Sequence, residues 1–509
     1  MNASDTLLPN WLARCAENFP RHLAIRCSEV RWSFAELDQQ ATRLARQLAA
    51  AGVRQGNRIA LLAANGLPYV VTVHALTRLR VILVPLNTRL TFEELGWQIR
   101  DVHASHLLSD TFYERIATDI VQAIPELIQG TLQAEPESND IVLKGSDEDL
   151  NTPLYTLIDL SATQAIMYTS GTTGNPKGVI ITYGMQWWNA IGSVLNLGHH
   201  HDDCWLACLP LFHIGGLSIL FRSVIYGISV ILHEKFDPVS VNVAIREDHV
   251  TIISVVAVML QRMLAVLDVN GSQKCYPSTL RCVLLGGGPA PRPLLEDCIA
   301  RSIPVVQTYG LTEACSQAVT LPPADALRKL GSAGRPLPQV QLRIMNENRP
   351  AISGKPGMIY LKGPSITPGY ANSPETTAEA IHDGWLCTGD IGYLDEEGYL
   401  YVLDRRSDLI ISGGENVYPA EIESVLLTHP DVAEAGVCGQ PDVQWGQVPI
   451  AFVRLHAGHD IDLEALLVHA TQHLARYKIP RVIYVIDHLP RNSSGKLLRR
   501  NLCALLENL

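Results

Sequence analysis

The stretch MYTSGTTGNPKG, at positions 167–178, has the residue types of a phosphate-binding loop. It supplies hydroxyl groups, permissive glycine backbone and one ammonium group through six residues: Thr169, Ser170, Gly171, Thr172, Thr173 and Lys177. An anion with several oxygens needs many short donors at once, and these groups provide them. The sequence therefore predicts a phosphate site, although clusters of Ser, Thr and Gly between strands are also common as solvated turns.

This loop differs from the Walker A type of phosphate loop. That pattern needs Ser or Thr directly after its lysine to reach a metal ion, whereas Gly178 follows Lys177. The apolar runs AIMY before the loop and VIIT after it predict two strands. We therefore expect the loop to connect strand to strand rather than strand to helix.

Other chemical groups stand in short segments beside apolar runs. These segments are PLFHIGGL (210–217), GGGPAP (286–291), TYGLTEACS (308–316), CTGD (387–390) and PRNSSGK (490–496). Arg222 lies within the apolar run SILFRSVIYG, where a charge must be paired or must face a ligand. A structural salt bridge and a ligand contact are both open for Arg222.

The composition indicates a compact protein of two or more domains. The chain has 509 residues, of which 47% are apolar and 18% charged. A net charge of −11, with no stripe dense in Lys and Arg, argues against broad nucleic-acid binding. The opening twenty residues lack the pattern of a secretory signal. The apolar stretch 213–233 is interrupted by Arg222 and three glycines, so we expect no membrane insertion.

The eleven cysteines are scattered and odd in number. We therefore expect reduced thiols and a cytoplasmic location. The run from His199 to Asp203 is interpreted as a polar loop, because adjacent residues rarely converge on one metal ion.

The elements expected to position the chemical groups follow an α/β rhythm. A helical pattern covers Leu12 to Ala51 with an interruption near Ser33, where Ser33 and Glu36 have the spacing of a capping box. Residues 58–87 show strand, helix and strand, which predicts a parallel unit. Residues 133–151 are polar and predict an irregular connection. The predicted class is therefore α/β.

Short strands and frequent turns after Gly331 predict a β-rich subdomain at 331–403 within a large N-terminal domain at 1–403. The last hundred residues have an α+β pattern of their own, so we predict a C-terminal domain at 408–509 and a boundary at 404–407.

Taken together, the six chemical segments resemble the adenylate-forming superfamily of acyl-CoA synthetases, luciferases and peptide-synthetase adenylation domains. Their order and spacing agree over essentially the whole chain. Three longer segments, at 209–227, 284–298 and 403–427, are most similar to the o-succinylbenzoate–CoA ligase family of menaquinone biosynthesis. The resemblance implies that ATP and Mg²⁺ activate a small aromatic carboxylate as an acyl-adenylate, which coenzyme A then converts to a thioester. Homo-oligomer formation is left open.

The resemblance also implies roles for individual ATP-binding residues. The loop and Lys177 would hold the β- and γ-phosphates. Five residues would bind the rest of the nucleotide and the metal. Tyr309 would contact the adenine, Thr312 the α-phosphate and Glu313 the Mg²⁺. Asp390 and Arg405 would bind the ribose. Core packing for Tyr309 and an ordinary turn for Asp390 are the structural alternatives.

Lys496 would carry the first half-reaction by bridging the substrate carboxylate and the α-phosphate. A solvated surface lysine is the alternative. In the second half-reaction, the pantetheine arm of coenzyme A would pass along Ser412, Gly413 and Gly414. The C-terminal domain would rotate about Ser407 between the two half-reactions.

Acyl-site residues are also carried over from the family. His213 would act as a gate between the acyl pocket and the thiol channel, or be an ordinary core histidine. Gly286, Gly287 and Gly288 would lie against a planar ring, or form a plain turn. Arg222 would pair with a second carboxylate, and Ser316 and Thr320 would donate hydrogen bonds. The alternatives for the whole chain are an aryl- or fatty-acyl-CoA synthetase and a non-catalytic nucleotide-binding relative.

Overall fold

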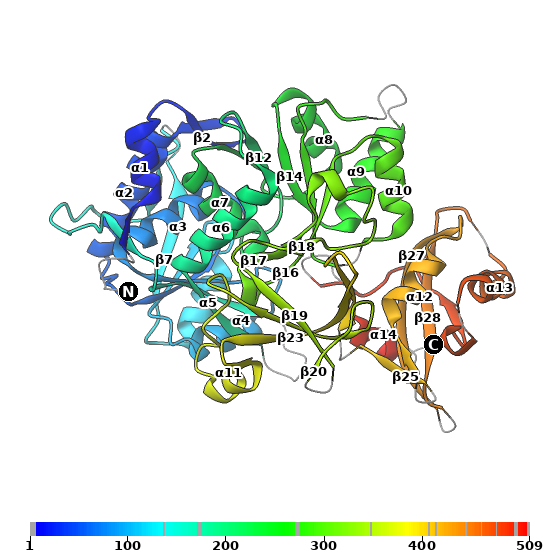
Figure 1. Cartoon of the computed structure of the whole chain (residues 1–509). Helices are drawn as coiled ribbons and strands as arrows, with labels where there is room; N and C mark the ends of the chain where they lie inside the picture. Colours follow the sequence, from blue (N-terminus) through cyan, green and yellow to red (C-terminus); the bar gives the residue numbers. More distant parts are fainter. Residues whose placement is uncertain are drawn as a thin grey trace.

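The computed structural model describes residues 7–135, 138–169, 176–269, 275–288, 290–346, 349–405, 408–412, 415–442, 445–459, 461–474, 476–492 and 497–505. A large N-terminal part, coloured blue to yellow in Figure 1, stands beside a smaller C-terminal part, coloured orange to red.

A seven-stranded sheet carries the strands of the phosphate loop at one edge. In spatial order its strands are β11 (Lys177–Thr182), β10 (Thr163–Thr169), β5 (Ile82–Pro85), β4 (Arg58–Leu62), β6 (His106–Asp110), β7 (Ile128–Ala134) and β8 (Ile141–Leu143). β10 and β11 pair antiparallel, which confirms the predicted strand–loop–strand arrangement. β4 and β5 are parallel, as the strand–helix–strand pattern predicts.

A nine-stranded sheet forms the second layer. Its order is β18 (Arg335–Pro336), β17 (Ser316–Thr320), β16 (Val305–Leu311), β15 (Cys282–Leu285), β14 (Ile252–Val255), β12 (Cys204–Ala207), β13 (Ser229–Leu232), β2 (Leu23–Cys27) and β3 (Val30–Ser33). Every residue of β12, β13, β14 and β15 is buried. Such continuous apolar strands are typical of parallel sheets covered on both faces.

Helices fill the space between these sheets and cover their outer faces. One core joins both sheets to α1 (Trp11–Asn18), α2 (Phe34–Ala50), α3 (Leu67–Leu79), α6 (Tyr183–Leu197) and α7 (Ile214–Tyr226). A second core packs α8 (Pro238–Glu247), α9 (Ala257–Val269) and α10 (Arg292–Ala300) on the nine-stranded sheet. A third packs α4 (Phe92–Asp101) and α5 (Glu114–Ala123) on the seven-stranded sheet. The result is a layered α/β architecture.

Two smaller sheets complete the N-terminal part. A six-stranded sheet contains β20 (Arg349–Pro350), β19 (Gln341–Asn346), β21 (Gly357–Lys362), β23 (Trp385–Leu394), β22 (Ile381–His382) and β24 (Leu400–Arg405), and α11 (Pro374–Ala380) accompanies it. A two-stranded sheet joins β1 (Leu7–Pro9) to β9 (Leu157–Asp159). The predicted β-rich texture after Gly331 agrees with this region.

The C-terminal part has a five-stranded sheet of its own. It consists of β26 (Glu415–Val417), β25 (Ile410–Ser412), β28 (Gly446–Leu455), β27 (Val432–Asp442) and β29 (Ile483–Val485), with α12 (Pro419–Leu426), α13 (Leu463–His473) and α14 (Arg499–Leu505). The α/β class is confirmed, whereas the domain boundary at 404–407 stays a prediction.

Two local predictions are wrong. Residues 23–33 are not part of an interrupted helix but form the hairpin of β2 and β3, because β2 pairs with the buried strand β13 and Ser28 turns the chain with a φ of 52°. Residues 133–151 are not wholly irregular, because β8 pairs with β7. Gln40 and Gln47 of α2 stabilise this pairing, because their side-chain oxygens accept hydrogen bonds from the backbone N–H groups of Ile141 and Leu143. The capping box of Ser33 and Glu36 is confirmed.

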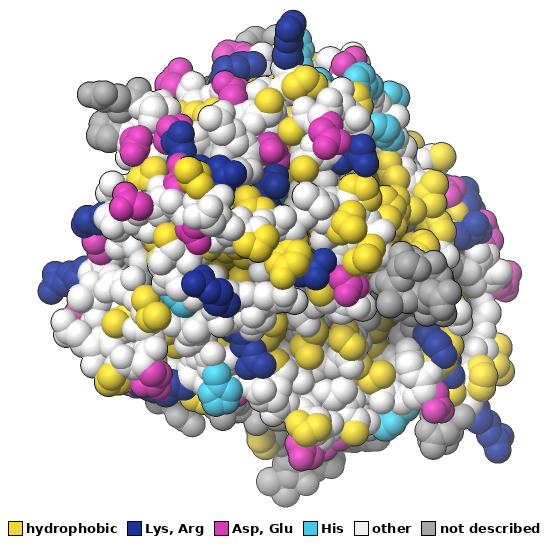
Figure 2. Space-filling model, turned by 90° about the vertical axis from the view of Figure 1, so that its left-hand side faces the viewer, with side chains coloured by type: hydrophobic (Ala, Val, Ile, Leu, Met, Phe, Trp, Pro, Cys, Tyr) yellow, Lys and Arg dark blue, Asp and Glu magenta, His cyan; other side chains and the backbone are white. Residues whose placement is uncertain are grey.

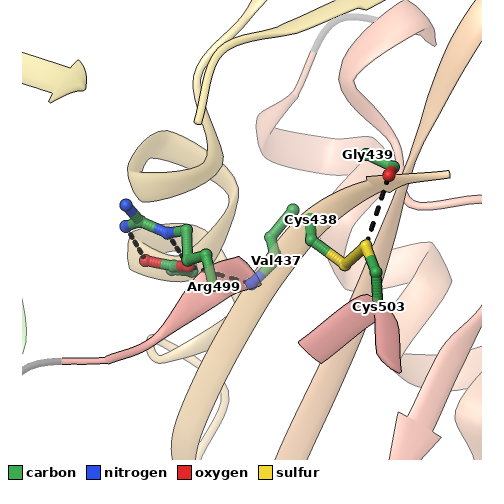
Figure 3. The surroundings of a disulfide bond; sticks show 6 residues. Val437, Cys438, Gly439, Arg499 and Cys503 are labelled. Atoms are coloured by element: carbon green, nitrogen blue, oxygen red, sulfur yellow. Dashed lines mark hydrogen bonds and ion pairs between the residues drawn. A yellow bond between two sulfur atoms is a disulfide. The ribbon is translucent and has the colours of Figure 1, made fainter. Parts of the chain in front are cut away.

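The cysteines correct a third expectation. Nine are free, but Cys438 in β27 is joined to Cys503 in α14 by a disulfide (Figure 3). The expectation of reduced thiols throughout is therefore wrong for this pair. The bond ties the helix that follows the PRNSSGK segment to β27, a strand at the edge of the C-terminal sheet.

The surface and the helices agree with the composition. Basic and acidic side chains are interspersed over the face shown in Figure 2, with hydrophobic side chains between them. Within the ranges given above, no helix is long and apolar enough to cross a bilayer.

Candidate active site

The predicted site segments meet at one edge of the nine-stranded sheet. β14, β15 and β16 are parallel, so their carboxyl ends lie side by side. Gly286 follows β15, and Tyr309 lies near the end of β16. In open α/β sheets, ligands bind outside the carboxyl ends of the strands. The sheet therefore brings the glycine segment and the TYGLTE segment to the place where a ligand is expected.

The predicted adenosine-binding residues are connected across two sheets. The Tyr309 hydroxyl donates a hydrogen bond to Asp390 Oδ2 at 2.6 Å, and Asp390 is buried. Asp390 of β23 lies opposite Arg405 of β24 in the antiparallel register. The two residues predicted for the ribose thus occupy paired positions, and the phenol of Tyr309 is bonded to the same carboxylate.

A tight turn after β16 positions the residues predicted for phosphate and metal. A Cβ atom on Gly310 would lie 1.5 Å from the carbonyl oxygen of Ser316, so only glycine fits there. Thr312 and Glu313 follow in a 3₁₀ helix, η2 (Thr312–Ala314). Cys315 and Ser316 have positive φ angles of 56° and 90°, and they return the chain into β17.

Glu313 is held by a residue that the sequence analysis missed. The Tyr370 hydroxyl donates to Glu313 Oε1 at 3.1 Å, and Lys177 Nζ lies 5.7 Å from the centre of the Tyr370 ring. Tyr370 stands in GYANSPETT, where only turn residues are evident in the sequence. The fold alone brings the predicted metal ligand, this tyrosine and the predicted phosphate-binding lysine together.

This arrangement fits Mg²⁺ held mainly by its substrate. In the part of the chain that the structure describes, no group of three or more His, Cys, Asp and Glu side chains could hold a metal ion. Mg²⁺ usually keeps several waters and binds one or two carboxylates together with substrate phosphates. Glu313 beside Lys177 has the chemistry for that mode.

Arg222 lies at the centre of α7 and is 2% exposed. Its Nη2 donates to Asn189 Oδ1 at 2.7 Å, and its guanidinium lies 5.4 Å from the centre of the Trp205 ring. Over the described ranges, Nε has no hydrogen-bond partner and no carboxylate forms an ion pair with Arg222. Burial lowers the pKa of this guanidinium. The salt-bridge alternative for Arg222 thus finds no partner among these residues.

Asn189 of α6 links Arg222 to the turn after η2, and sequence reasoning also missed it. Its Nδ2 donates to the carbonyl oxygens of Ala314, at 3.2 Å, and Gln317, at 2.7 Å. Because the Asn189 side chain is buried, these bonds fix the orientation of its amide, with Oδ1 facing Arg222. An asparagine within a helical pattern gives no sign of this position.

The remaining acyl-site candidates differ in accessibility. Thr320 is completely buried, and its hydroxyl lies 2.9 Å from that of Thr308 and accepts from Gln317 Nε2. Ser316 is half-buried. His213 caps the start of α7, and its ring centre lies 4.7 Å from that of Phe212. Burial, with a smaller effect of Arg89, lowers the pKa of His213 to about 4, so the imidazole is neutral near pH 7.

A cleft of about 140 Å³ separates the N-terminal and C-terminal parts. One wall contains Gly286, Gly287 and Gly288, and Gly287 has a φ of 81°. The opposite wall contains Arg491 and Leu497, which flank the NSSGK segment. Ser412 is buried and is not among the residues that line this cleft.

Several predicted residues cannot be placed in this geometry. Those that lie outside the described residues are Ser170, Gly171, Thr172, Thr173, Ser407, Gly413, Gly414 and Lys496. Thr169 and Lys177, at the two ends of the phosphate loop, are opposite each other in the β10–β11 pair.

Comparison with known families assigns the family of this chain. The family model of AMP-binding enzymes matches residues 12–371, and that of the AMP-binding enzyme C-terminal domain matches residues 421–496. The chain belongs to the AMP-binding enzyme family. The resemblance inferred from the six segments is thereby confirmed.

Full-length relatives within this family include the 2-succinylbenzoate–CoA ligase of Geobacillus kaustophilus. It is 52% identical to this chain over 98% of both sequences. The o-succinylbenzoate CoA synthetase (MenE) of Bacillus subtilis has been solved with its acyl-adenylate intermediate, at 45% identity, 98% coverage of both chains and a TM-score of 0.89.

The same Bacillus subtilis enzyme has been solved in other states. Its complex with ATP and a magnesium ion gives a TM-score of 0.88 at 45% identity, covering 98% of this chain and 100% of that one. A double mutant bound to a product analogue gives a TM-score of 0.73 at 44% identity and 98% coverage of both chains. The overall structure of this AMP-binding enzyme is thus more similar to the ATP and adenylate complexes than to the product-analogue complex.

Proposed function

We infer that this AMP-binding enzyme is an ATP-dependent ligase that converts o-succinylbenzoate to o-succinylbenzoyl-CoA for menaquinone biosynthesis. Its similarity to the two ligases of that acid extends over nearly the whole chain. The observation that carries the assignment within this site is Arg222, a buried cation without a carboxylate partner among the described residues. A dicarboxylate substrate would supply that partner.

The reaction has two half-reactions. First, a carboxylate oxygen of the acid forms a bond to the α-phosphorus of ATP, and the bond to pyrophosphate breaks. Then the sulfur of coenzyme A bonds to the acyl carbon, and AMP leaves. Mg²⁺, when bound, would offset the negative charge of the phosphates. Catalysis in both steps depends on cations and donors placed where charge develops.

We propose the following roles for individual groups. The loop from Thr169 to Lys177 binds the leaving pyrophosphate, and Thr312 binds the α-phosphate. Lys496 bridges the reacting carboxylate and the α-phosphate, which is supported by the position of Leu497 across the cleft from the glycine segment. Tyr309, Asp390 and Arg405 bind the adenosine, which the bond between Tyr309 and Asp390 supports.

We further propose that the C-terminal domain, 408–509, rotates between the half-reactions about Ser407. The lower TM-score of the product-analogue complex, at nearly the same identity and coverage, supports two arrangements. In the second arrangement, Ser412, Gly413 and Gly414 would line the path of coenzyme A while His213 gates it. Ser412 is not among the residues that line the cleft described above, which supports a role for it in the second arrangement only.

We place this reaction in the cytoplasm. Nine free cysteines support a reducing compartment. Formation of homo-oligomers stays a prediction, which sedimentation of the purified chain would test.

Pyrophosphate release with a panel of acids tests the proposed function. We expect turnover with o-succinylbenzoate to exceed that with benzoate, coumarate or a fatty acid by at least about 100-fold in kcat/KM, because the monocarboxylates leave Arg222 unpaired. A higher kcat/KM for benzoate or a fatty acid would support the alternative acyl-CoA synthetase. No ATP–pyrophosphate exchange with any acid would support a non-catalytic relative.

Replacing Arg222 tests the carboxylate contact. We expect Arg222→Leu to raise KM for o-succinylbenzoate about 10- to 100-fold, because a charge-assisted hydrogen bond is lost. KM for benzoate should stay within about 2-fold, which makes benzoate the internal control. Arg222→Lys keeps the charge, so its KM for o-succinylbenzoate should lie between those of the unchanged enzyme and Arg222→Leu. Equal changes for both acids would remove Arg222 from the acyl site.

A further inference from the structure

Tyr370 lies in a segment that connects the strand leaving the phosphate loop to η2. The backbone N–H of Ile180 donates to the carbonyl oxygen of Gly369 at 3.1 Å, and that of Ala371 donates to Gly178 at 2.7 Å. On the other side, the N–H of Thr367 donates to the carbonyl oxygen of Glu313 at 2.7 Å. Residues 367–371 therefore fix the distance between β11 and η2.

The side chain of Tyr370 repeats this connection with the chemical groups themselves. Its hydroxyl donates to Glu313 Oε1 at 3.1 Å, and the face of its ring lies 5.7 Å from Lys177 Nζ, within the range of a cation–π contact.

We propose that Tyr370 is a positioning residue that holds the Glu313 carboxylate and the Lys177 ammonium in place for binding Mg²⁺–ATP. A carboxylate ligand on a short 3₁₀ helix has several side-chain rotamers, and the hydroxyl bond favours one of them. The aromatic face restrains the flexible stem of Lys177 in the same way. This inference rests on the proposed function for ATP only, and not on the identity of the acid.

Calorimetric binding of ATP, with no acid present, tests the proposal. Tyr370→Phe removes the hydroxyl and keeps the ring, so the variant should fold. We expect its affinity for ATP in excess Mg²⁺ to fall about 10-fold, because a hydrogen bond to a charged group is lost. Its affinity for ATP in EDTA should stay within about 2-fold. Tyr393→Phe is the matched control, since Tyr393 of β23 stacks on Tyr401 of β24. This control variant should change neither ATP affinity.

A double-mutant cycle tests the contact with Lys177. The loss of ATP affinity in Lys177→Ala should be smaller in a Tyr370→Leu background than in a Tyr370→Phe background, because only the phenylalanine keeps the ring face. Equal losses in the two backgrounds would refute the lysine part of the proposal. An equal effect of Tyr370→Phe with and without Mg²⁺, or no effect in either, would refute the Glu313 part. Both readouts are independent of the acyl substrate, so the acid panel can fail while this test succeeds.

Discussion

Lys496→Ala is expected to lower the rate of acyl-adenylate formation by about 10²- to 10³-fold, the usual loss when one donor to a developing negative charge is removed. Thioester formation from supplied acyl-adenylate should fall less than about 10-fold. The reason for the difference is that only the first half-reaction joins two anions, the substrate carboxylate and the α-phosphate.

The cleft between the two parts of the chain supports this assignment. Leu497 follows Lys496 directly and lies across the cleft from Gly287, where the acyl group is proposed to bind. The residue that follows the proposed catalytic lysine therefore lines this cleft, which supports the proposed role. The ammonium group of Lys496 would bridge both anions without a proton transfer.

Rapid-quench measurement of each half-reaction separates these rates. Lys478→Ala is the matched control, because Lys478 stands in the same domain and pairs with Glu421 at 2.7 Å. It should leave both half-reactions within about 2-fold, as expected for an exposed ion pair. A Lys496→Ala enzyme that loses both half-reactions equally would contradict the assigned role.

The architecture could be predicted from the sequence where the signal is local. The apolar runs on either side of residues 169–177 and the alternation of strands with helices reflect side-chain periodicity, which does not depend on distant contacts. The hairpin at residues 23–33 was missed because its strands are short and its partner, β13, comes some two hundred residues later. Burial against that partner decides its conformation.

The site followed the same rule. Thr312, Glu313 and Asp390 belong to contiguous segments that resemble family motifs, so the sequence alone is enough to name them as candidates. Tyr370 and Asn189 act through contacts with residues more than thirty positions away, and neither stands in a chemical pattern. Only the packing of residues 367–371 between β11 and η2, and of α6 against the turn after β16, reveals them.

Arg499→Met is expected to lower the stability of the C-terminal part by about 3 to 5 kcal/mol, because breaking a buried ion pair leaves uncompensated charges. Arg499 of α14 donates through Nε and Nη2 to the two oxygens of Glu423 at 2.8 and 2.7 Å, and Figure 3 shows this fork. Its Nη1 donates to Asp404 at 2.7 Å and to Asp408 at 3.2 Å. The exposed side-chain fractions are 12% for Arg499, 10% for Glu423 and 3% for Asp404.

The charges explain the direction of this effect. Burial opposes the charge of Arg499, but attraction to Glu423, and then to Asp404 and Asp408, outweighs it and raises the pKa of the guanidinium. Glu423 also accepts the backbone N–H of Val437 at 2.9 Å, so the arginine stabilises β27 through this carboxylate. Methionine has a similar length and no charge, and it would leave the carboxylates without their cation.

Urea unfolding combined with hydrogen exchange of β27 and α14 measures the loss. Arg481→Met is the matched control, because Arg481 pairs with Asp442 in the same domain but its side chain is 59% exposed, and it should cost less than about 1 kcal/mol. If Arg499→Met and Arg481→Met lower stability equally, the buried cluster contributes no more than a surface pair. If exchange in β27 rises only in Arg499→Met, the cation holds the sheet through Glu423. Asp404 precedes the proposed pivot at Ser407, whereas Arg499, Glu423 and Asp408 follow it. Of these contacts, the bond between Arg499 and Asp404 would therefore have to break if the domain rotates.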